Sequence, residues 1–143
     1  MSRLTRALGQ AALGGVLLTA GAGHLTTQRR EFQAQVPSWF PADPDKVVLA
    51  SGVVELAIGT ALLATWKQPA RGLLGKAVAA FFVGVFPGNI AQFVERKDGF
   101  GLDTDTKRAL RLLGQPALVA WALAATRPAG PAPASRRQEA GLT

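Results

Sequence analysis

The chain has no cysteine and a single histidine among its 143 residues. The absence of cysteine excludes disulfide frameworks, thiol redox relays and iron–sulfur ligation by this chain. A lone histidine cannot hold a haem iron from both sides, and the sequence shows no flavin or metal-ligand pattern. No metal site and no cofactor is therefore assigned. Any redox cofactor is expected to belong to a partner or to be the substrate itself.

Four long apolar segments lack the polar stripe of water-soluble helices, which would recur about every 3.6 residues. They cover residues 7–25, 47–66, 72–94 and 109–126. Each is about long enough to cross a hydrocarbon core of roughly 30 Å as a helix. The sequence therefore predicts an all-α integral membrane protein in which residues 1–127 form an antiparallel four-helix bundle. The low-complexity residues 128–143 are expected to be a disordered tail.

The first apolar segment has a second interpretation. Arg3 and Arg6 precede a stretch that ends in Ala20-Gly21-Ala22, a pattern that also resembles a signal peptide. Three apolar segments would remain even after cleavage, and the stretch lacks the polar exit of a typical cleavage site. A retained first helix is therefore favoured.

The net charge of +7 comes from basic residues that flank the apolar segments and do not form one patch. This arrangement favours anionic lipid headgroups over nucleic acid as the partner. Lysine and arginine divide equally between the two sides of the predicted bundle, so the positive-inside rule does not decide its orientation. The acidic residues concentrate in the connections 26–46 and 95–107, and the short connection 67–71 is purely basic. These two features favour an inner-membrane protein with both termini in the cytoplasm.

The two longer connections are expected to differ in environment. Connection 26–46 is rich in proline, which stops regular helices, and its Trp39 and Phe40 suit the headgroup level of a bilayer. Connection 95–107 is charged and contains Gly99 and Gly101, as expected for a solvated loop.

Glu55 places a carboxylate inside the second apolar segment, where an unpaired charge costs several kcal/mol. In an antiparallel bundle, the end of the first segment, the start of the second, the end of the third and the start of the fourth share one side. The candidate ligand-binding or proton-handling residues fall in those places: His24, Ser51, Glu55, Asn89, Arg111 and Gln115. At the other end only Lys76 intrudes, and its side chain can reach the surface. The sequence predicts one buried polar site near the outer side.

Helical spacing assigns a direction and a partner to Glu55. Ser51, Gly52, Glu55 and Gly59 share one face of the second segment, and its glycines are expected to face neighbouring helices. Arg111 is the expected charge partner, since an arginine that faces a carboxylate in a low dielectric can form a bidentate pair. The alternative is purely structural, namely that this pair holds the helices in register.

Several motifs in this order resemble the DoxX-like family of small membrane proteins over residues 11–124. They are Gly23-His24-Leu25, Val36-Pro37 with Trp39-Phe40-Pro41, Ser51-Gly52 with Glu55, Phe86-Pro87-Gly88-Asn89, and Arg111 with Gln115 and Trp121. The resemblance implies a four-span bundle and points to His24, Glu55, Asn89, Arg111 and Gln115. Some relatives associate with quinone-linked sulfur oxidation or redox complexes, and distant ones assist receptor assembly. Leu25 departs from the phenylalanine that often follows the histidine.

The resulting expectation is an accessory subunit, or a small-ligand site, of a membrane redox system, with a quinone as the candidate ligand. Glu55 would accept a proton or pair with a charge, Arg111 would keep the carboxylate ionised, and His24 would relay a proton. No catalytic residue is assigned, and activity of the chain alone is not expected. The alternatives are a small proton-coupled transporter and an assembly or structural partner without ligand chemistry. The expected partners are the lipid bilayer and a membrane redox or assembly protein.

Overall fold

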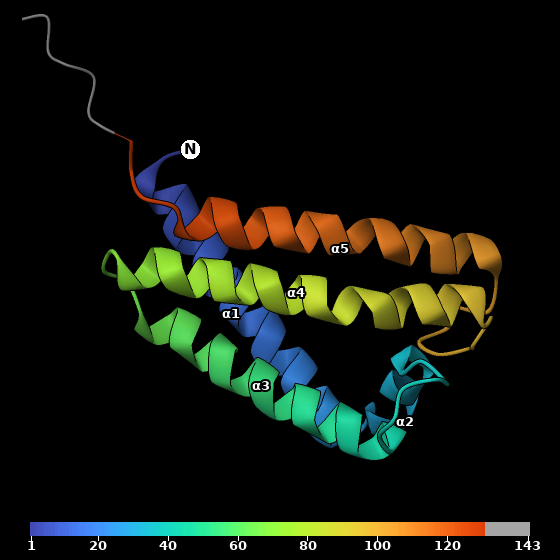
Figure 1. Cartoon of the computed structure of the whole chain (residues 1–143). Coiled ribbons are helices and arrows are strands. Elements are labelled where there is room, and N and C mark those ends of the chain that lie inside the picture. Colours follow the sequence, from blue (N-terminus) through green and yellow to red (C-terminus); the bar gives the residue numbers. More distant parts are fainter. Residues whose placement is uncertain (131–143) are drawn as a thin grey trace, which may run out of the picture.

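The structure is a computed structural model that describes residues 1–130, and within that range it contains helices and no strands. The elements are α1 (Arg3–Leu25), α2 (Arg29–Phe32), the 3-10 helix η1 (Gln33–Gln35), α3 (Pro44–Ala64), α4 (Ala70–Val94) and α5 (Asp105–Thr126) (Figure 1). The all-α prediction is confirmed. The predicted disordered tail falls largely on residues 131–143, outside the described residues.

Three of the long helices begin several residues before the apolar segments of the sequence analysis, because polar residues cap their first turns. In α1, the Ser2 hydroxyl accepts a hydrogen bond from the Thr5 amide. In α3, the Asp43 carboxylate accepts hydrogen bonds from the amides of the first turn. In α5, the Thr104 hydroxyl accepts a hydrogen bond from the Lys107 amide. Each cap satisfies an amide that has no partner within the helix. The helices therefore start at residues 3, 44 and 105 and not at 7, 47 and 109.

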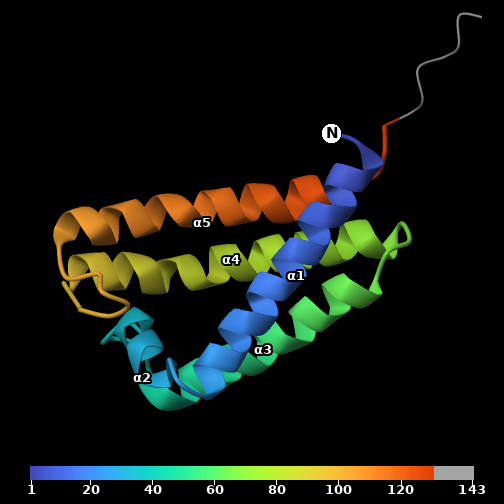
Figure 2. The same ribbon diagram turned by 180° about the vertical axis from the view of Figure 1, so that it is seen from behind.

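The four long helices are arranged as two antiparallel pairs. Helix α1 packs against α3 at an oblique angle, whereas α4 and α5 run side by side (Figure 2). The pairs meet mainly through α1 and α5, and α3 touches α4 far less. Toward the end that carries α2, α3 diverges from α4, and α2 lies at the wide side of this divergence (Figure 1).

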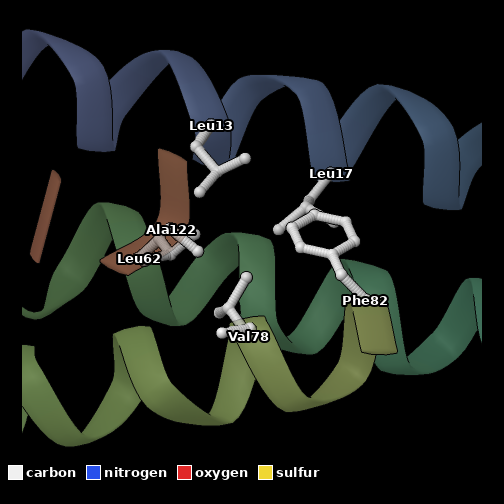
Figure 3. Packing of buried hydrophobic residues seen from close by; sticks show 7 residues of the cluster. Leu13, Leu17, Leu62, Val78, Phe82 and Ala122 are labelled. Carbon is white, nitrogen blue, oxygen red and sulfur yellow. The ribbon is translucent and has the colours of Figure 1, made fainter. Parts of the chain in front are cut away.

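The hydrophobic core lies where all four long helices converge. Its side chains interdigitate between the two pairs and are nearly inaccessible to solvent: Leu13, Leu17, Leu62, Val78, Phe82 and Ala122 (Figure 3). Burial of apolar side chains from four different helices at one level fixes the relative heights of the helices.

Glycines bring α1 and α3 into backbone contact next to Glu55. A Cβ atom added at Gly52 would lie 2.6 Å from the His24 Cβ and 3.1 Å from the Gly21 carbonyl oxygen. Gly52, Glu55 and Gly59 are all buried, so the predicted inward direction of this face of α3 is confirmed. This close approach places the last turn of α1 directly against the first half of α3.

Three helices, α3, α4 and α5, are long and apolar enough to cross a membrane. Within their most apolar windows only 28%, 39% and 22% of residues are buried inside the protein, so most of this apolar surface faces outward. Helix α1 is not among them, because its charged, polar and glycine residues lower its mean hydropathy. A fourth crossing, formed by α1, stays a prediction.

Replacement of Gly52 by alanine is expected to destabilise the protein by about 1–3 kcal/mol, because the added methyl group would collide with α1. Gly15→Ala is the matched control, since no atom lies within 4 Å of a Cβ added there. It should be neutral or stabilising by up to about 1 kcal/mol through helix propensity. Thermal unfolding in detergent measures both variants, and equal stability of the two would contradict the proposed close packing.

Candidate ligand-binding site

A cavity of about 640 Å³ lies at the end of the molecule where α3 and α4 diverge. Its walls come from α1, α3, α4 and α5, and the chain from Phe32 to Phe40 lies across it. The structure brings all six candidate residues of the sequence analysis to this one cavity: His24, Ser51, Glu55, Asn89, Arg111 and Gln115. Residues distant in sequence therefore share a single space of ligand size.

His24 and Glu55 form a buried pair on the floor of the cavity. The His24 Nε2 and Glu55 Oε2 atoms are 3.4 Å apart, and the two residues are 7% and 9% exposed. The other ring nitrogen, Nδ1, lies 3.0 Å from the Val48 carbonyl oxygen. A carbonyl oxygen only accepts, so Nδ1 must carry a hydrogen and donate it.

This hydrogen bond constrains the protonation state of the pair. When His24 is neutral with its hydrogen on Nδ1, the Nε2 atom presents a lone pair toward an oxygen of Glu55. A lone pair facing a carboxylate oxygen is repulsive, and one additional proton on either residue removes the repulsion. The geometry therefore favours a pair that holds one shared proton, as imidazolium with carboxylate or as imidazole with carboxylic acid.

The predicted ion pair between Glu55 and Arg111 does not form. Arg111 Nη1 instead donates to Gln115 Oε1 at 3.1 Å, and Gln115 Nε2 donates to the Phe82 carbonyl at 3.2 Å. Arg111 and Gln115 are one turn apart on α5, so their own helix brings them together. The partner of Glu55 is His24, because the glycine contact between α1 and α3 brings the end of α1 closer than α5.

Arg108, the other arginine in the first half of α5, does not line the cavity. Its guanidinium lies 2.5 Å from Asp98 in the α4–α5 connection and 2.9 Å from Asp105 at the start of α5. These acidic residues satisfy Arg108 at the surface end of the helix. Arg111 is thus the cation that lines the cavity.

Two buried oxygen atoms in the cavity wall accept no hydrogen bond from residues 1–130. They are Glu55 Oε2 and Asn89 Oδ1. The amide nitrogen of Asn89 donates to the Val85 carbonyl at 3.3 Å, so its oxygen is the atom left over. Buried acceptors without donors are costly. A proton shared with His24 would relieve Glu55 Oε2, which leaves the Asn89 oxygen as the acceptor that still lacks a donor.

Aromatic side chains from the connections complete the cavity. The Phe32 ring stacks on the His24 ring with centroids 3.4 Å apart, and Phe100 packs edge-on against Phe32 at 4.6 Å. Sequence reasoning missed both residues because they lie in connections that were assigned to headgroups and solvent. Phe100 has a φ of 56°, which is uncommon for a residue other than glycine and is typical of functional sites.

Polar contacts fasten the connection that covers the cavity to the loop between α4 and α5. Glu31 accepts from the Phe100 amide at 2.6 Å, Lys97 Nζ donates to the Val36 carbonyl at 2.7 Å, and Ser38 donates to Glu95. The Gln35 carbonyl also packs against α4 where Gly88 leaves room for it. The expected solvated loop is therefore part of the cavity cover.

A second buried polar cluster lies at the opposite end of the molecule, where only Lys76 was expected. Gln10 is fully buried, and its Nε2 donates to the carbonyls of Leu62 at 2.7 Å and Thr65 at 2.8 Å. Arg71 donates to Gln10 Oε1 at 2.5 Å and to the Ala125 carbonyl at 2.8 Å. The cluster satisfies carbonyls at the ends of α3 and α5, which explains it structurally. Gln10 within an apolar segment was the signal that could have revealed it.

Gln10→Leu is expected to lower the free energy of unfolding by about 1–3 kcal/mol, because two carbonyls and Arg71 lose a buried partner. Thr19→Val serves as the control, since Thr19 is exposed on the same helix and bonds locally to the Gly15 carbonyl. Chemical or thermal unfolding in detergent compares them. A Gln10→Leu variant as stable as the wild type would show that the cluster contributes nothing.

Glu95 gives the cavity cover a predictable pH dependence. Hydrogen bonds from Lys97, then from the Ser38 side chain and backbone, lower the pKa of Glu95 from 4.5 to about 2. A lowered pKa stabilises the fold above about pH 4.5, and this contribution disappears as the pH falls toward about 2. The wild type should therefore lose more thermal stability between about pH 5 and about pH 3 than Glu95→Gln, which cannot ionise. Equal losses of thermal stability in the wild type and in Glu95→Gln would contradict the lowered pKa of Glu95.

No three histidine, aspartate or glutamate side chains converge on a possible metal position within residues 1–130.

Comparison with known proteins assigns a family without an activity. The family model described as Domain of unknown function (DUF8561) matches residues 13–126. No curated protein and no solved structure matches the chain. The matched range contains the core, the cavity walls and all six candidate residues. The chain therefore belongs to the DUF8561 family.

Proposed function

We propose that this chain is an integral membrane protein whose cavity binds a small planar ligand of the quinone class. Its four long helices cross the bilayer as an antiparallel bundle, with both termini in the cytoplasm and the cavity near the outer side. The protein serves as an accessory subunit of a membrane redox system. The resemblance to DoxX-like proteins belongs to this proposal and is compatible with it.

Membrane insertion is supported by the apolar residues on the outer faces of the helices. Large side chains such as Leu73, Val83, Leu110 and Leu113 are 59–68% exposed along α4 and α5. A water-soluble monomer rarely leaves so much contiguous apolar surface uncovered. Hydrocarbon would cover it, and α1 could cross with the others because its polar residues Gln10 and His24 face inward.

The close approach of His24 and Glu55 in the cavity wall is the observation that carries the proposal. His24 and Glu55 can hold one proton next to the ligand space, and the Asn89 oxygen offers a second acceptor there. Arg111 supplies donors from α5. A ligand with a hydroxyl for Glu55 or Asn89 and a carbonyl for Arg111 would satisfy these groups together.

A quinone and its quinol fit this pattern chemically. Reduction of a quinone takes up two electrons and two protons, and oxidation of the quinol releases them. The His24–Glu55 pair could exchange one of these protons, while the electrons would come from or go to a redox partner. Aromatic side chains such as Phe32 and Phe100 provide flat surfaces for the ring. The apolar remainder of the cavity suits a hydrophobic substituent.

A proton-coupled transporter is the second candidate, and one structural observation favours it. Such a protein needs an aromatic-lined cavity around a carboxylate that no arginine neutralises. Phe32, Trp39 and Phe82 line the cavity, and Arg111 bonds to Gln115 and not to Glu55. A cationic substrate could then displace the proton of the pair. Arg111 in the same cavity still disfavours the transporter hypothesis, because its positive charge repels cationic substrates.

Quinone binding can be measured through Trp39, which lines the cavity. In a Trp66→Phe/Trp121→Phe background reconstituted in lipid nanodiscs, a short-chain ubiquinone should quench Trp39 fluorescence saturably. Glu55→Gln and Asn89→Leu are each expected to weaken binding about tenfold to a hundredfold, because the first replaces the proton-accepting carboxylate by an amide and the second removes a buried acceptor. Glu55→Gln should also change the pH dependence of binding while the protein stays folded.

Thr60→Val is the matched control, because Thr60 is exposed on α3 outside the cavity. It should bind as the wild type does. Absence of saturable quenching, or wild-type binding by Glu55→Gln, would contradict a quinone site at this pair. Saturable binding of a quaternary ammonium probe in place of the quinone would favour the transporter. Resistance of the protein to alkaline carbonate extraction tests membrane insertion separately.

A further inference from the structure

Charge is segregated between the two ends of the molecule. The end opposite the cavity, here called the basic end, carries the start of α1, the α3–α4 connection and the end of α5. Its charged side chains are all basic: Arg3, Arg6, Lys67, Arg71, Lys76 and Arg127. The acidic residues within the described range lie in α2, in α3 and its preceding connection, or around the α4–α5 loop. Within residues 1–130 the basic end therefore carries positive charge and no carboxylate.

The two ends of the molecule also differ in ion pairing. At the cavity end, Arg29, Lys97, Lys107 and Arg108 are each paired with a carboxylate. None of the six residues of the basic end forms an ion pair with a residue of the 1–130 range. Arg71 bonds to Gln10 and a carbonyl, as described above, whereas Lys76 and Arg127 are exposed. These two cations are therefore accessible to an external anion.

A groove of about 410 Å³ runs between α4 and α5 at the basic end, and both cations line it. Lys76 comes from α4 and Arg127 follows the last residue of α5. The remaining lining is small or apolar and includes Gly72, Ala120 and Ala124. The two helices meet closely beside it, since a Cβ atom at Gly75 would overlap the Thr126 hydroxyl. The groove thus joins an apolar wall to a pair of positive charges.

We propose that this α4–α5 groove binds an anionic phospholipid, with the phosphate ester between Lys76 and Arg127 and an acyl chain along the small residues. Arginine offers a planar pair of donors to phosphate oxygens, and lysine adds a mobile point charge. An acyl chain explains the apolar wall, which a free phosphate ion would leave unused. A second copy of the chain fits less well, because a symmetric contact would bring two basic ends together.

This inference rests on the membrane insertion proposed above. It also assigns the basic end to one side of the membrane. Anionic lipids concentrate in the cytoplasmic leaflet, where each basic residue near the surface gains about 1 kcal/mol. A lipid site at the basic end therefore favours cytoplasmic termini. The orientation with cytoplasmic termini is therefore supported by the cations of the basic end that form no ion pair within the described residues.

The test measures lipid binding by the full chain, purified in a neutral detergent, using native mass spectrometry. Phosphatidylglycerol is compared with phosphatidylcholine of identical acyl chains, and inorganic phosphate forms a third arm. The wild type should retain phosphatidylglycerol preferentially. Lys76→Gln/Arg127→Gln should bind it about thirtyfold more weakly, since each cation contributes about fivefold. Inorganic phosphate should not compete at equal concentration.

Arg30→Gln/Lys46→Gln is the charge-matched control, because both residues are exposed at the cavity end and form no ion pair within the described range. It should bind phosphatidylglycerol as the wild type does. Equal retention of the two lipids by the wild type, equal losses in both double variants, or displacement by inorganic phosphate would each overturn the proposal. Failure of the protein to enter liposomes would instead overturn membrane insertion, and with it the proposed function.

Discussion

The backbone contact between α1 and α3 determines the arrangement of the candidate site. Gly21 and Gly52 let the two helices approach so closely that a single methyl group would not fit between them. This approach carries His24, near the last residue of α1, onto Glu55 in the middle of α3. Without it Glu55 would need another partner, and the pair that can share a proton would not exist. One packing constraint therefore selects the chemistry available to the cavity.

The same constraint contributes to the cavity itself. Because α1 binds α3 so tightly, and α4 binds α5, the two pairs behave as units that meet in the core and separate toward α2. The resulting space is covered by the connection after α1, which hydrogen bonds fasten to the α4–α5 loop. Aromatic side chains reach the cavity from this cover. Both walls and cover are needed to produce a space of ligand size.

The two ends of the helices differ in how they use buried polar side chains. Around Gln10 and Arg71 the side chains satisfy helix-terminal carbonyls, so this cluster is explained by structure alone, although Arg6 Nε at the same end has no partner within residues 1–130. Glu55 and Asn89 satisfy no helix end, and each has an oxygen atom without a hydrogen-bond donor within residues 1–130. Since unsatisfied buried groups are costly, they persist where another requirement outweighs stability. Both residues line the cavity, which is the physical reason to propose ligand binding at this end.

The sequence alone determined the long helices, because uninterrupted apolar residues and proline-rich or charged connections allow few alternatives. It also identified the six polar residues of the cavity, since antiparallel packing of consecutive helices brings alternate helix ends to one side. Three of the helices extend three or four residues N-terminal to the apolar segments, because caps such as Asp43 and Thr104 are polar. Only the tertiary structure decided that His24, and not Arg111, pairs with Glu55. That choice depends on interhelical distances set by two glycines, and the places of Phe32, Phe100 and Gln10 depend on loop paths and helix rotation. None of these quantities is encoded in the periodicity of a single segment.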